Sequence, residues 1–264
     1  MTQLNPKGRL VINLAEEFRH LPRAPIVEAV IDIRSHAAGT FEEAAVRQFL
    51  EPRLDGYEYL DTQRAVQHEL TFEVTKPPRQ MFKDLGLKGL RFRSADQKSI
   101  AQFNRDGFIH SRLEPYSDWT SFSGEGLRLW EIFKELAQPV EINRIGLRFI
   151  SRIELPLSVA RLDDYIKPAP ETPRDLELPF VGFMHHDTLA VPGYPYAINL
   201  IRTIQPPQAE TRANSGLILD IDVFTTQGLE IEETGLARIL EEMRWLKNKA
   251  FFGSVTEKAL EAFQ

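Results

Sequence analysis

Arginines recur along one predicted strand, residues 140–155. Alternate residues of a pleated strand share a face, so Arg144, Arg148 and Arg152 are predicted to lie together, opposite a row of apolar side chains. The rigid fork of N–H donors on a guanidinium suits phosphate and carboxylate groups. Gly146 interrupts the row and would let a ligand come close to the backbone. The strand therefore predicts an anion-binding surface.

Two other predicted strands carry charges with the same period of two. Glu28, Asp32 and Arg34 alternate with apolar residues near the start of the chain, and Asp220 and Asp222 do so near its end. An unpaired guanidinium away from water costs several kcal/mol, so these carboxylates are the expected counter-charges. The predicted ligand-binding set consists of Arg144, Arg148, Arg152, Arg34, Glu28 and Arg112.

Three interpretations of this charged face compete with anion binding. A solvated face crossed by salt bridges would gain only about 0–1 kcal/mol per pair. A metal-dependent phosphate-transfer or nuclease-type enzyme would use Asp220 and Asp222, about 7 Å apart on one side of a strand, with Glu28 and Mg²⁺. A structural or assembly protein would present an exposed patch formed by Tyr116, Trp119 and the proline-rich loop at 168–179.

Other chemical motifs are weak. His185, His186 and Asp187 are adjacent, but neighbouring residues of a strand point to opposite faces and cannot easily share one ion. Arg105 and His110 have the spacing of a helical ribonuclease motif, yet they fall across a predicted hairpin. The chain has no cysteine, no phosphate-binding glycine loop and no nucleophile-elbow serine,. We therefore favour a binding module over an enzyme, with no cofactor apart from the magnesium alternative.

The composition sets the class of protein. Of 264 residues, 42% are hydrophobic and 27% are charged, and the formal net charge is −6, which argues against nucleic acid as the partner,. No run of about 20 apolar residues could cross a bilayer, and residues 1–22 lack a secretory signal. We expect a cytoplasmic protein without a membrane partner. Its partner would be an anionic small molecule or an acidic protein segment, with a homo-oligomer as a further option.

Apolar periodicity and turn residues predict the elements that carry these side chains. The first half is expected to hold strands at 26–34, 68–74, 87–94, 99–103 and 108–113 and helices at 40–50 and 124–136. The second half is expected to hold strands at 140–155, 188–191, 196–204 and 216–225, a short helix at 159–166 and a longer helix at 234–249. Gly253 is expected to stop that helix, and a final short helix capped by Ser254 and Glu257 is expected to end near Phe263,. Thr40 and Glu43 have capping-box spacing, Pro77-Pro78 is expected to end a strand, and residues 104–107 predict a hairpin turn.

Each half thus runs strand, helix, several strands, helix. We expect an α+β fold: a mainly antiparallel curved sheet with long helices on one face, built from two similar β-α-β-β-β-α halves. The expected organisation is a lead-in at 1–24, an N-terminal half at 25–138 and a C-terminal half at 139–264, joined as one compact unit. The similarity lies in element order, so a duplication is a hypothesis.

Five segments share features with one family. They are Pro25-Ile26-x-Glu28-Ala29, Arg112-Leu113-x-Pro115-Tyr116-x-x-Trp119, Arg144-x-Gly146-Leu147-Arg148-x-x-x-Arg152-Ile153, Asp220-x-Asp222 and residues 251–256. Together they resemble a family of bacterial proteins of unknown function described as sporadically distributed. The resemblance implies a prokaryotic, cytoplasmic protein, and by analogy a mobile or defence-associated gene. It supplies no reaction or catalytic residue, and Phe149-Ile150-Ser151 departs from the expected tyrosine and asparagine.

Overall fold

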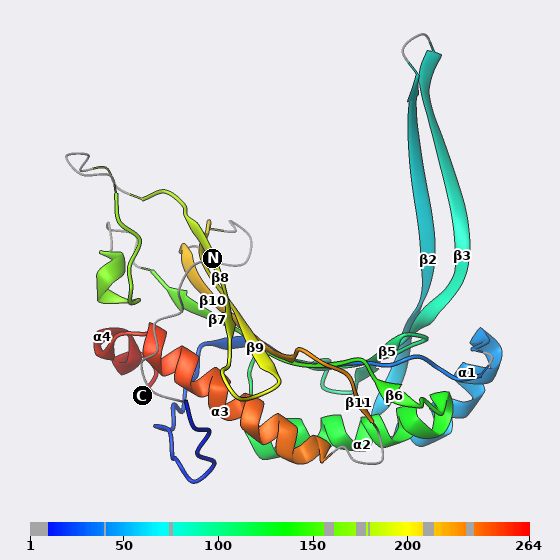
Figure 1. Cartoon of the computed structure of the whole chain (residues 1–264), viewed down its shortest axis with the longest axis horizontal. Helices are drawn as coiled ribbons and strands as arrows, with labels where there is room; N and C mark the ends of the chain where they lie inside the picture. The colour runs from blue at the N-terminus through cyan, green and yellow to red at the C-terminus, as the bar shows by residue number, and fades with distance from the viewer. Residues whose placement is uncertain are drawn as a thin grey trace.

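The computed structural model describes residues 10–39, 41–73, 76–155, 161–172, 178, 180–207, 214–230 and 235–264. Its centre is one nine-stranded antiparallel sheet in the order β2-β3-β4-β5-β1-β7-β10-β9-β8 (Figure 1). A small two-stranded sheet pairs β11 with β6. The predicted α+β class with a mainly antiparallel sheet is confirmed.

The elements have the following bounds. The strands are β1 (Ile26–Arg34), β2 (Tyr57–Glu73), β3 (Lys76–Ser94), β4 (Ser99–Asn104), β5 (Gly107–Leu113), β6 (Glu141–Ile142), β7 (Arg144–Glu154), β8 (Met184–Ala190), β9 (Tyr196–Gln205), β10 (Gly216–Thr225) and β11 (Leu229–Glu230). The helices are α1 (Glu43–Leu50), α2 (Trp119–Ala137), α3 (Leu236–Ser254) and α4 (Glu257–Glu261), with 3-10 turns η1 (Glu51–Arg53) and η2 (Leu162–Asp164). Within the described part of the chain, no helix is long and apolar enough to span a bilayer.

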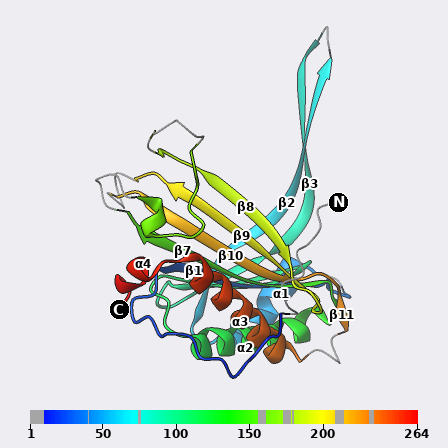
Figure 2. The same cartoon turned by 60° about the vertical axis from the view of Figure 1, so that its left-hand side comes forward.

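Both long helices lie on one face of the curved sheet (Figures 1 and 2). The apolar residues of the central strands point toward them: Ile31, Leu147 and Val223 stand side by side on β1, β7 and β10 and are fully buried. Leu129 of α2 and Met243 of α3 are equally buried. The face under the helices is the core, because strand alternation directs every second side chain there. We call the opposite, upper face in Figure 1 the concave face.

The helix α2 begins five residues before its predicted start. Asp118 caps it by accepting a hydrogen bond from the Ser121 backbone N–H at 2.8 Å, which satisfies one of the free donors of the first turn,. Gly126 then lets the helix approach the sheet closely, since a Cβ there would lie 2.6 Å from Ile31 Cδ1. The prediction missed this start because Trp119 and Phe122 precede the regular apolar stripe.

Three other predicted boundaries are wrong. The helix α3 continues to Ser254, past Gly253, which does not stop it. The helix α1 begins after Glu42, which makes no side-chain cap hydrogen bond, and Thr40 lies outside the described residues. The strand after the first helix does not end before Pro77-Pro78, because β3 includes both prolines.

The two prolines lie where β2 and β3 extend far beyond the sheet as a two-stranded ribbon (Figure 1), at a shift in the register where neither has a strand partner in the described ranges. Residues 89–93 of β3 pair with β4, and along the rest of β3 one edge has no neighbouring strand among the described residues. A proline can occupy such an edge without removing a ladder hydrogen bond. We call residues 64–73 and 76–87 the arm.

The two halves share one sheet, because β1 pairs with β7 along most of its length. From this central pair the strand order runs outward as β1-β5-β4-β3 in one half and as β7-β10-β9-β8 in the other. Each half then places one long helix on the same face. In the second half, the described part of the expected helix at 159–166 holds only the 3-10 turn η2, and no counterpart of β2 occurs among the described residues. A duplication stays a prediction.

Candidate functional site

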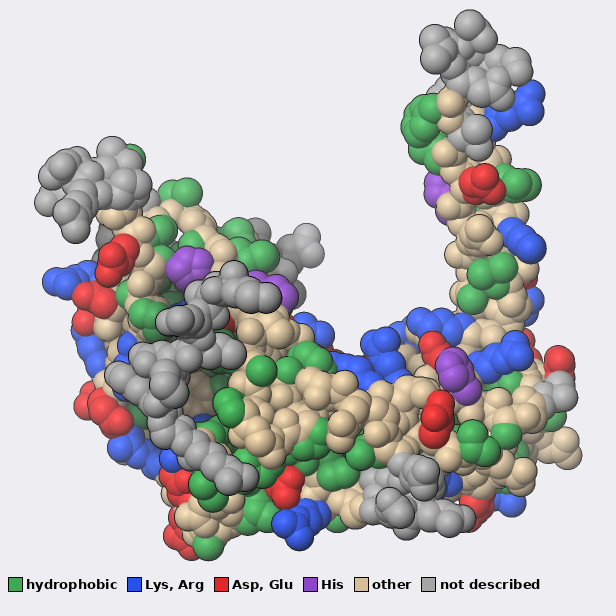
Figure 3. Space-filling view, viewed as in Figure 1, with side chains coloured by type: hydrophobic (Ala, Val, Ile, Leu, Met, Phe, Trp, Pro, Cys, Tyr) green, Lys and Arg blue, Asp and Glu red, His purple; other side chains and the backbone are tan. Residues whose placement is uncertain are grey.

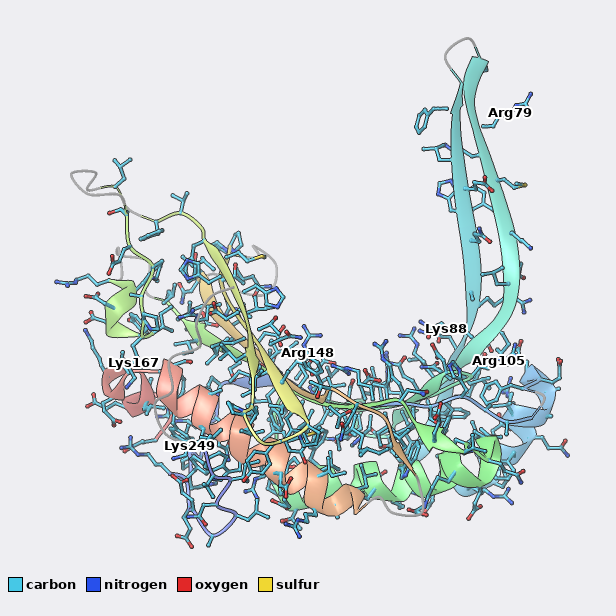
Figure 4. All side chains as sticks on the ribbon, viewed as in Figure 1. Arg79, Lys88, Arg105, Arg148, Lys167 and Lys249 are labelled. Atoms are coloured by element: carbon cyan, nitrogen blue, oxygen red, sulfur yellow. The ribbon has the colours of Figure 1, made fainter. Side chains whose placement is uncertain are left out.

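Two of the predicted arginines do meet on the concave face. Arg148 stands above the middle of the sheet, on the side away from the helices (Figure 4). Arg144 lies opposite Arg34 of β1 in the strand register, and Asp222 of β10 lies opposite Arg148. The strand alternation therefore placed these side chains on the predicted face.

Carboxylates on the neighbouring strands neutralise Arg144. Its Nη1 donates to Asp32 Oδ2 at 3.0 Å and its Nη2 to Asp222 Oδ2 at 2.7 Å, so the guanidinium bridges β1 and β10. Gly146 makes this possible, because a Cβ there would lie 2.4 Å from Arg144 Nη1. The glycine thus accommodates the protein's own guanidinium. The expectation that it opens the backbone to a ligand is corrected.

Arg148 pairs with Asp220 of β10 but remains half exposed. Its Nε donates to Asp220 Oδ1 at 2.8 Å and its Nη2 donates to Oδ2. The arginine side chain is 46% exposed and the aspartate only 9%, so the cation lies above its counter-ion. The hydrogen bonds that Arg148 donates to Asp220 raise the pKa of Arg148, and the charges of Asp220, Asp222 and Glu28 add to this. Burial raises the pKa of Asp222 despite Arg144 and Arg148.

Arg152 shares this face but is covered. Its Nε donates to Gln205 Oε1 at 3.1 Å, its Nη2 donates to the Asn214 carbonyl at 2.7 Å, and it forms an ion pair with Glu154. The side chain is 2% exposed and passes over Gly216, where a Cβ would clash with it. Its predicted place in a ligand surface is corrected, since no ligand reaches it.

Arg112 lies on the other face of the sheet. It stands opposite Ala29, a fully buried core residue, and therefore points to the helix side. Its Nη1 donates to Asp96 Oδ2 at 2.6 Å and to Ser99 Oγ at 3.2 Å. The prediction that Arg112 joins the other arginines is wrong. Arg112 pairs with Ala29, which pairs with Phe149 on β7, and Phe149 points to the face opposite Arg148.

The carboxylates proposed for magnesium are engaged with arginine. Asp220 accepts from Arg148 and Asp222 accepts from Arg144. In the described ranges no group of three or more potential metal ligands occurs. His185 and His186 stand opposite Arg202 and Ile201, so the strand β8 directs them to opposite faces. The magnesium alternative stays a prediction without support from this geometry.

The arm turns exposed apolar side chains toward the hollow above the sheet, on a face where Gln80 and Asp84 also lie by register. Arg79 points away from the hollow (Figure 4), and Leu70, His68, Phe82 and Val66 belong to the opposite face of the ribbon by register. The side chains of Val66 and Phe82 are 58% and 67% exposed. His68 stacks on Phe82 with ring centroids 4.4 Å apart. We call these four residues the inner face of the arm.

The floor of the hollow is rich in basic side chains (Figure 3). Arg34 is 63% exposed, and Asp32, its partner at 3.3 Å, is 20% exposed. Lys88 and Arg105 lie at the base of the arm (Figure 4), where the Arg105 N–H donates to the Lys88 carbonyl at 2.8 Å. The hollow thus combines a basic floor with one apolar wall.

A cavity of about 570 Å³ opens on the helix side of the same sheet. It lies between the lead-in segment, the start of α2 and the second half of α3. Its lining includes Phe149 and Ser151 of β7, together with Tyr116, Trp119 and Phe251. Tyr116 packs on Phe149 with ring centroids 5.6 Å apart, and Trp119 is only 8% exposed. The predicted exposed patch at Tyr116 and Trp119 is therefore wrong. Residues 173–177 and 179 of the loop assigned to that patch lie outside the described residues.

Lys247 of α3 lines this cavity without a partner of opposite charge. Its Nζ lies 4.1 Å from the centroid of the Phe149 ring. It makes no hydrogen bond or ion pair with any residue in the described part of the chain. Burial lowers the pKa of Lys247 to about 7, and the nearby charge of Arg244 contributes to the shift. Arg34, Arg144, Arg148 and Arg152 of the concave face, in contrast, each form an ion pair with a carboxylate.

Comparisons with known proteins give no relative for this chain. No family model matches it, no curated protein matches it, and no solved structure matches it. The resemblance to the sporadically distributed bacterial family therefore stays a prediction.

Two features were missed in the sequence. Lys247 follows Leu246 in an amphipathic helix, where a lysine normally marks the solvated face, so periodicity hid its position,. The inner face of the arm was hidden because Pro77-Pro78 was taken as the end of a strand. The alternation of Val66, His68, Leu70 and Phe72 was a usable signal for a longer ribbon,.

Proposed function

We propose that the protein is a cytoplasmic binding module whose hollow receives a segment of a partner protein that carries acidic and apolar side chains. The observation that carries this proposal is the exposed apolar inner face of the arm beside a basic floor. The enzyme and magnesium alternatives gain no comparable support.

The arm supports a protein partner. A two-stranded ribbon is marginally stable in water by itself, and exposed apolar side chains gathered on one face are typical of interaction surfaces. Val66, Leu70 and Phe82 all expose 42% or more of their surface, although none contributes to the core. A partner that covers them would gain apolar burial and would fix the ribbon.

The floor supports acidic side chains in that partner. The side chains of Asp220 and Asp32 are less exposed than those of their partners Arg148 and Arg34. The N–H donors of the two arginines therefore lie closer to solvent than the carboxylates. Arg148 Nη1 makes no hydrogen bond to the described residues, which leaves a donor for a ligand carboxylate. Such contacts on a half-exposed arginine contribute chiefly to specificity and association rate.

Site-specific photo-crosslinking tests whether the partner binds to the inner face of the arm. A benzophenone amino acid placed at Phe82, on the inner face, should give a discrete adduct in living host cells. The same amino acid at Lys83, the next residue on the outer face, is the matched control and should give none. Equal adducts at both positions, or adducts at neither, would contradict the proposal.

The charge requirement is tested with a defined probe. A fluorescent peptide of alternating glutamate and leucine should bind the protein, and Arg148→Met should weaken binding about tenfold, as expected for loss of a charge-assisted hydrogen bond. Arg79→Met, on the outer face of the arm, should leave the affinity unchanged. A single-stranded DNA that binds through Arg148 more tightly than the peptide would instead indicate a nucleic-acid partner.

A further inference from the structure

The cavity on the helix side of the sheet has the size and lining of a small-molecule site. Its volume of about 570 Å³ falls within the range of about 300–1,000 Å³ found for ligand pockets,. Aromatic rings form much of its wall: Phe149 from β7, Tyr116 from the segment before α2, and Phe251 from α3. Polar and charged side chains, among them Ser151 and Lys247, form the rest of the lining, so the wall is partly aromatic and partly polar.

The charges around the cavity favour an anion. Arg19, Arg244 and Lys247 line it, whereas Asp118 is the only acidic residue in its lining. The Asp118 carboxylate is committed to the start of α2, because it accepts from the Ser121 N–H and from Ser121 Oγ, each at 2.8 Å. Arg244 is held by Glu241 and stacks over Trp119.

Lys247 is the cation of the lining that has no carboxylate partner in the described part of the chain. Arg19 has Glu257 as a partner at 2.9 Å, but no carboxylate among the described residues pairs with Lys247. Its contact with the Phe149 ring offsets only part of the cost of removing an ammonium group from water,. A half-buried cation at the wall of a cavity is stabilised by an anion that enters the cavity.

We propose that this cavity binds a small organic carboxylate, whose carboxylate group accepts a hydrogen bond from Lys247 Nζ and whose apolar body packs against Phe149 and Tyr116. The site is independent of the hollow, because it lies on the opposite face of β7. A carboxylate next to Lys247 would restore the ammonium form, and burial of its body would fill the aromatic wall.

The test compares an acid with its uncharged amide. Binding of 6-phenylhexanoate and of 6-phenylhexanamide is measured by calorimetry at pH 7 with the full chain. The acid should bind at least about tenfold more tightly than the amide, as charge-assisted hydrogen bonds require. Lys247→Met should abolish that preference while it retains the aliphatic stem. Lys134→Met, on the outer surface of α2, should leave the preference intact.

A second variant locates the site. Ser151→Leu places a larger side chain into the cavity wall and should weaken binding of both acid and amide, whereas the fold is checked by circular dichroism. The proposal is overturned if the acid and the amide bind equally well to the natural protein. It is also overturned if neither binds at about 10 mM, or if Lys247→Met keeps the preference for the acid.

Discussion

The two faces of the strand β7 treat charge in opposite ways. On the concave face, Arg144 and Arg148 each donate hydrogen bonds to carboxylates of neighbouring strands. On the helix face, Lys247 rests on Phe149 with no counter-ion in the described part of the chain. Charges that alternate along adjacent strands can pair through the sheet register. The surroundings of a cation on a helix depend on how the helix packs, and Lys247 packs against an aromatic ring.

Because of this difference, Lys247 is a stronger candidate for binding an anion than the arginine row. The arginine row, the most visible feature of the sequence, largely satisfies itself and offers only its outer N–H donors. Lys247 has the unmet electrostatic requirement. An unpaired charge is costly where a paired one is nearly neutral, so the two sites should respond differently to substitution.

The largest expected effect is at Lys247. Its folded pKa of about 7 lies below the ordinary 10.5, so between these values the unfolded chain holds a proton that the folded chain has lost. The free energy of unfolding therefore rises with pH across this window. We expect Lys247→Met to raise that free energy by about 2–3 kcal/mol at pH 6, with the gain fading toward pH 10.

Urea denaturation from pH 6 to pH 10 measures this gain. Arg19, Arg244, Asp118, Tyr116 and His20 are the other charged or titratable side chains of the lining. Hydrogen bonds from Ser121 hold the pKa of Asp118 below its ordinary value, and burial keeps the pKa of Tyr116 above its ordinary range. His20→Gln is the control for the imidazole in the same lining. A variant that is less stable than the natural protein at pH 6 would show that Lys247 has a partner.

On the concave face the opposite sign is expected. Arg144→Met should lower the free energy of unfolding by about 2 kcal/mol, because Asp32 and Asp222, only 20% and 18% exposed, lose a shared partner,. Denaturant midpoints measure this loss. The triple variant with Asp32→Asn and Asp222→Asn should recover much of it, and a failure to recover would place the cost elsewhere.

His110 sharpens the comparison on the helix face. Burial lowers its pKa to about 4 from the ordinary 6.5, since it lies between Phe122 and the core. Between these values the unfolded chain binds the extra proton, so stability falls as the pH drops from 6.5 to 4. His110→Leu should remove about 1–2 kcal/mol of this acid sensitivity. Melting curves at pH 7 and pH 4.5 check it, and an unchanged slope would contradict a neutral buried histidine.

The smallest effect is expected at Arg34. Its side chain is 63% exposed. Its ion pair with Asp32, at 3.3 Å, is longer than the ion pair that Arg144 makes with the same carboxylate oxygen at 3.0 Å. Arg34→Met should change the free energy of unfolding by no more than about 0.5 kcal/mol. A loss as large as that of Arg144→Met would show that the exposed rim of the concave face is as essential as its centre.

Much of the fold could be predicted because it depends on local patterns. The alternation in residues 26–34 and 216–225 placed Glu28 and Asp220 on one face and the core residues on the other, as the register confirms. The turn before Gly107 was also predictable. A Cβ there would lie 2.3 Å from the Ile33 carbonyl oxygen, and the φ of +145° favours glycine. The start of α2 and the length of the arm were not predictable, because a cap and an unpaired strand edge overrode the usual signals.

The sequence by itself determined the α+β class and the side of each strand that carries charge, because a period of two is a property of every pleated strand. Only the tertiary structure decided which charges are satisfied. Arg152 is covered by residues more than fifty positions away along the chain, and Arg112 faces the other side through its register with β1. The cavity beside Lys247 exists only where the lead-in segment, β7, α2 and α3 converge. Electrostatic free energy depends on distance and burial in space, which periodicity along the chain does not contain.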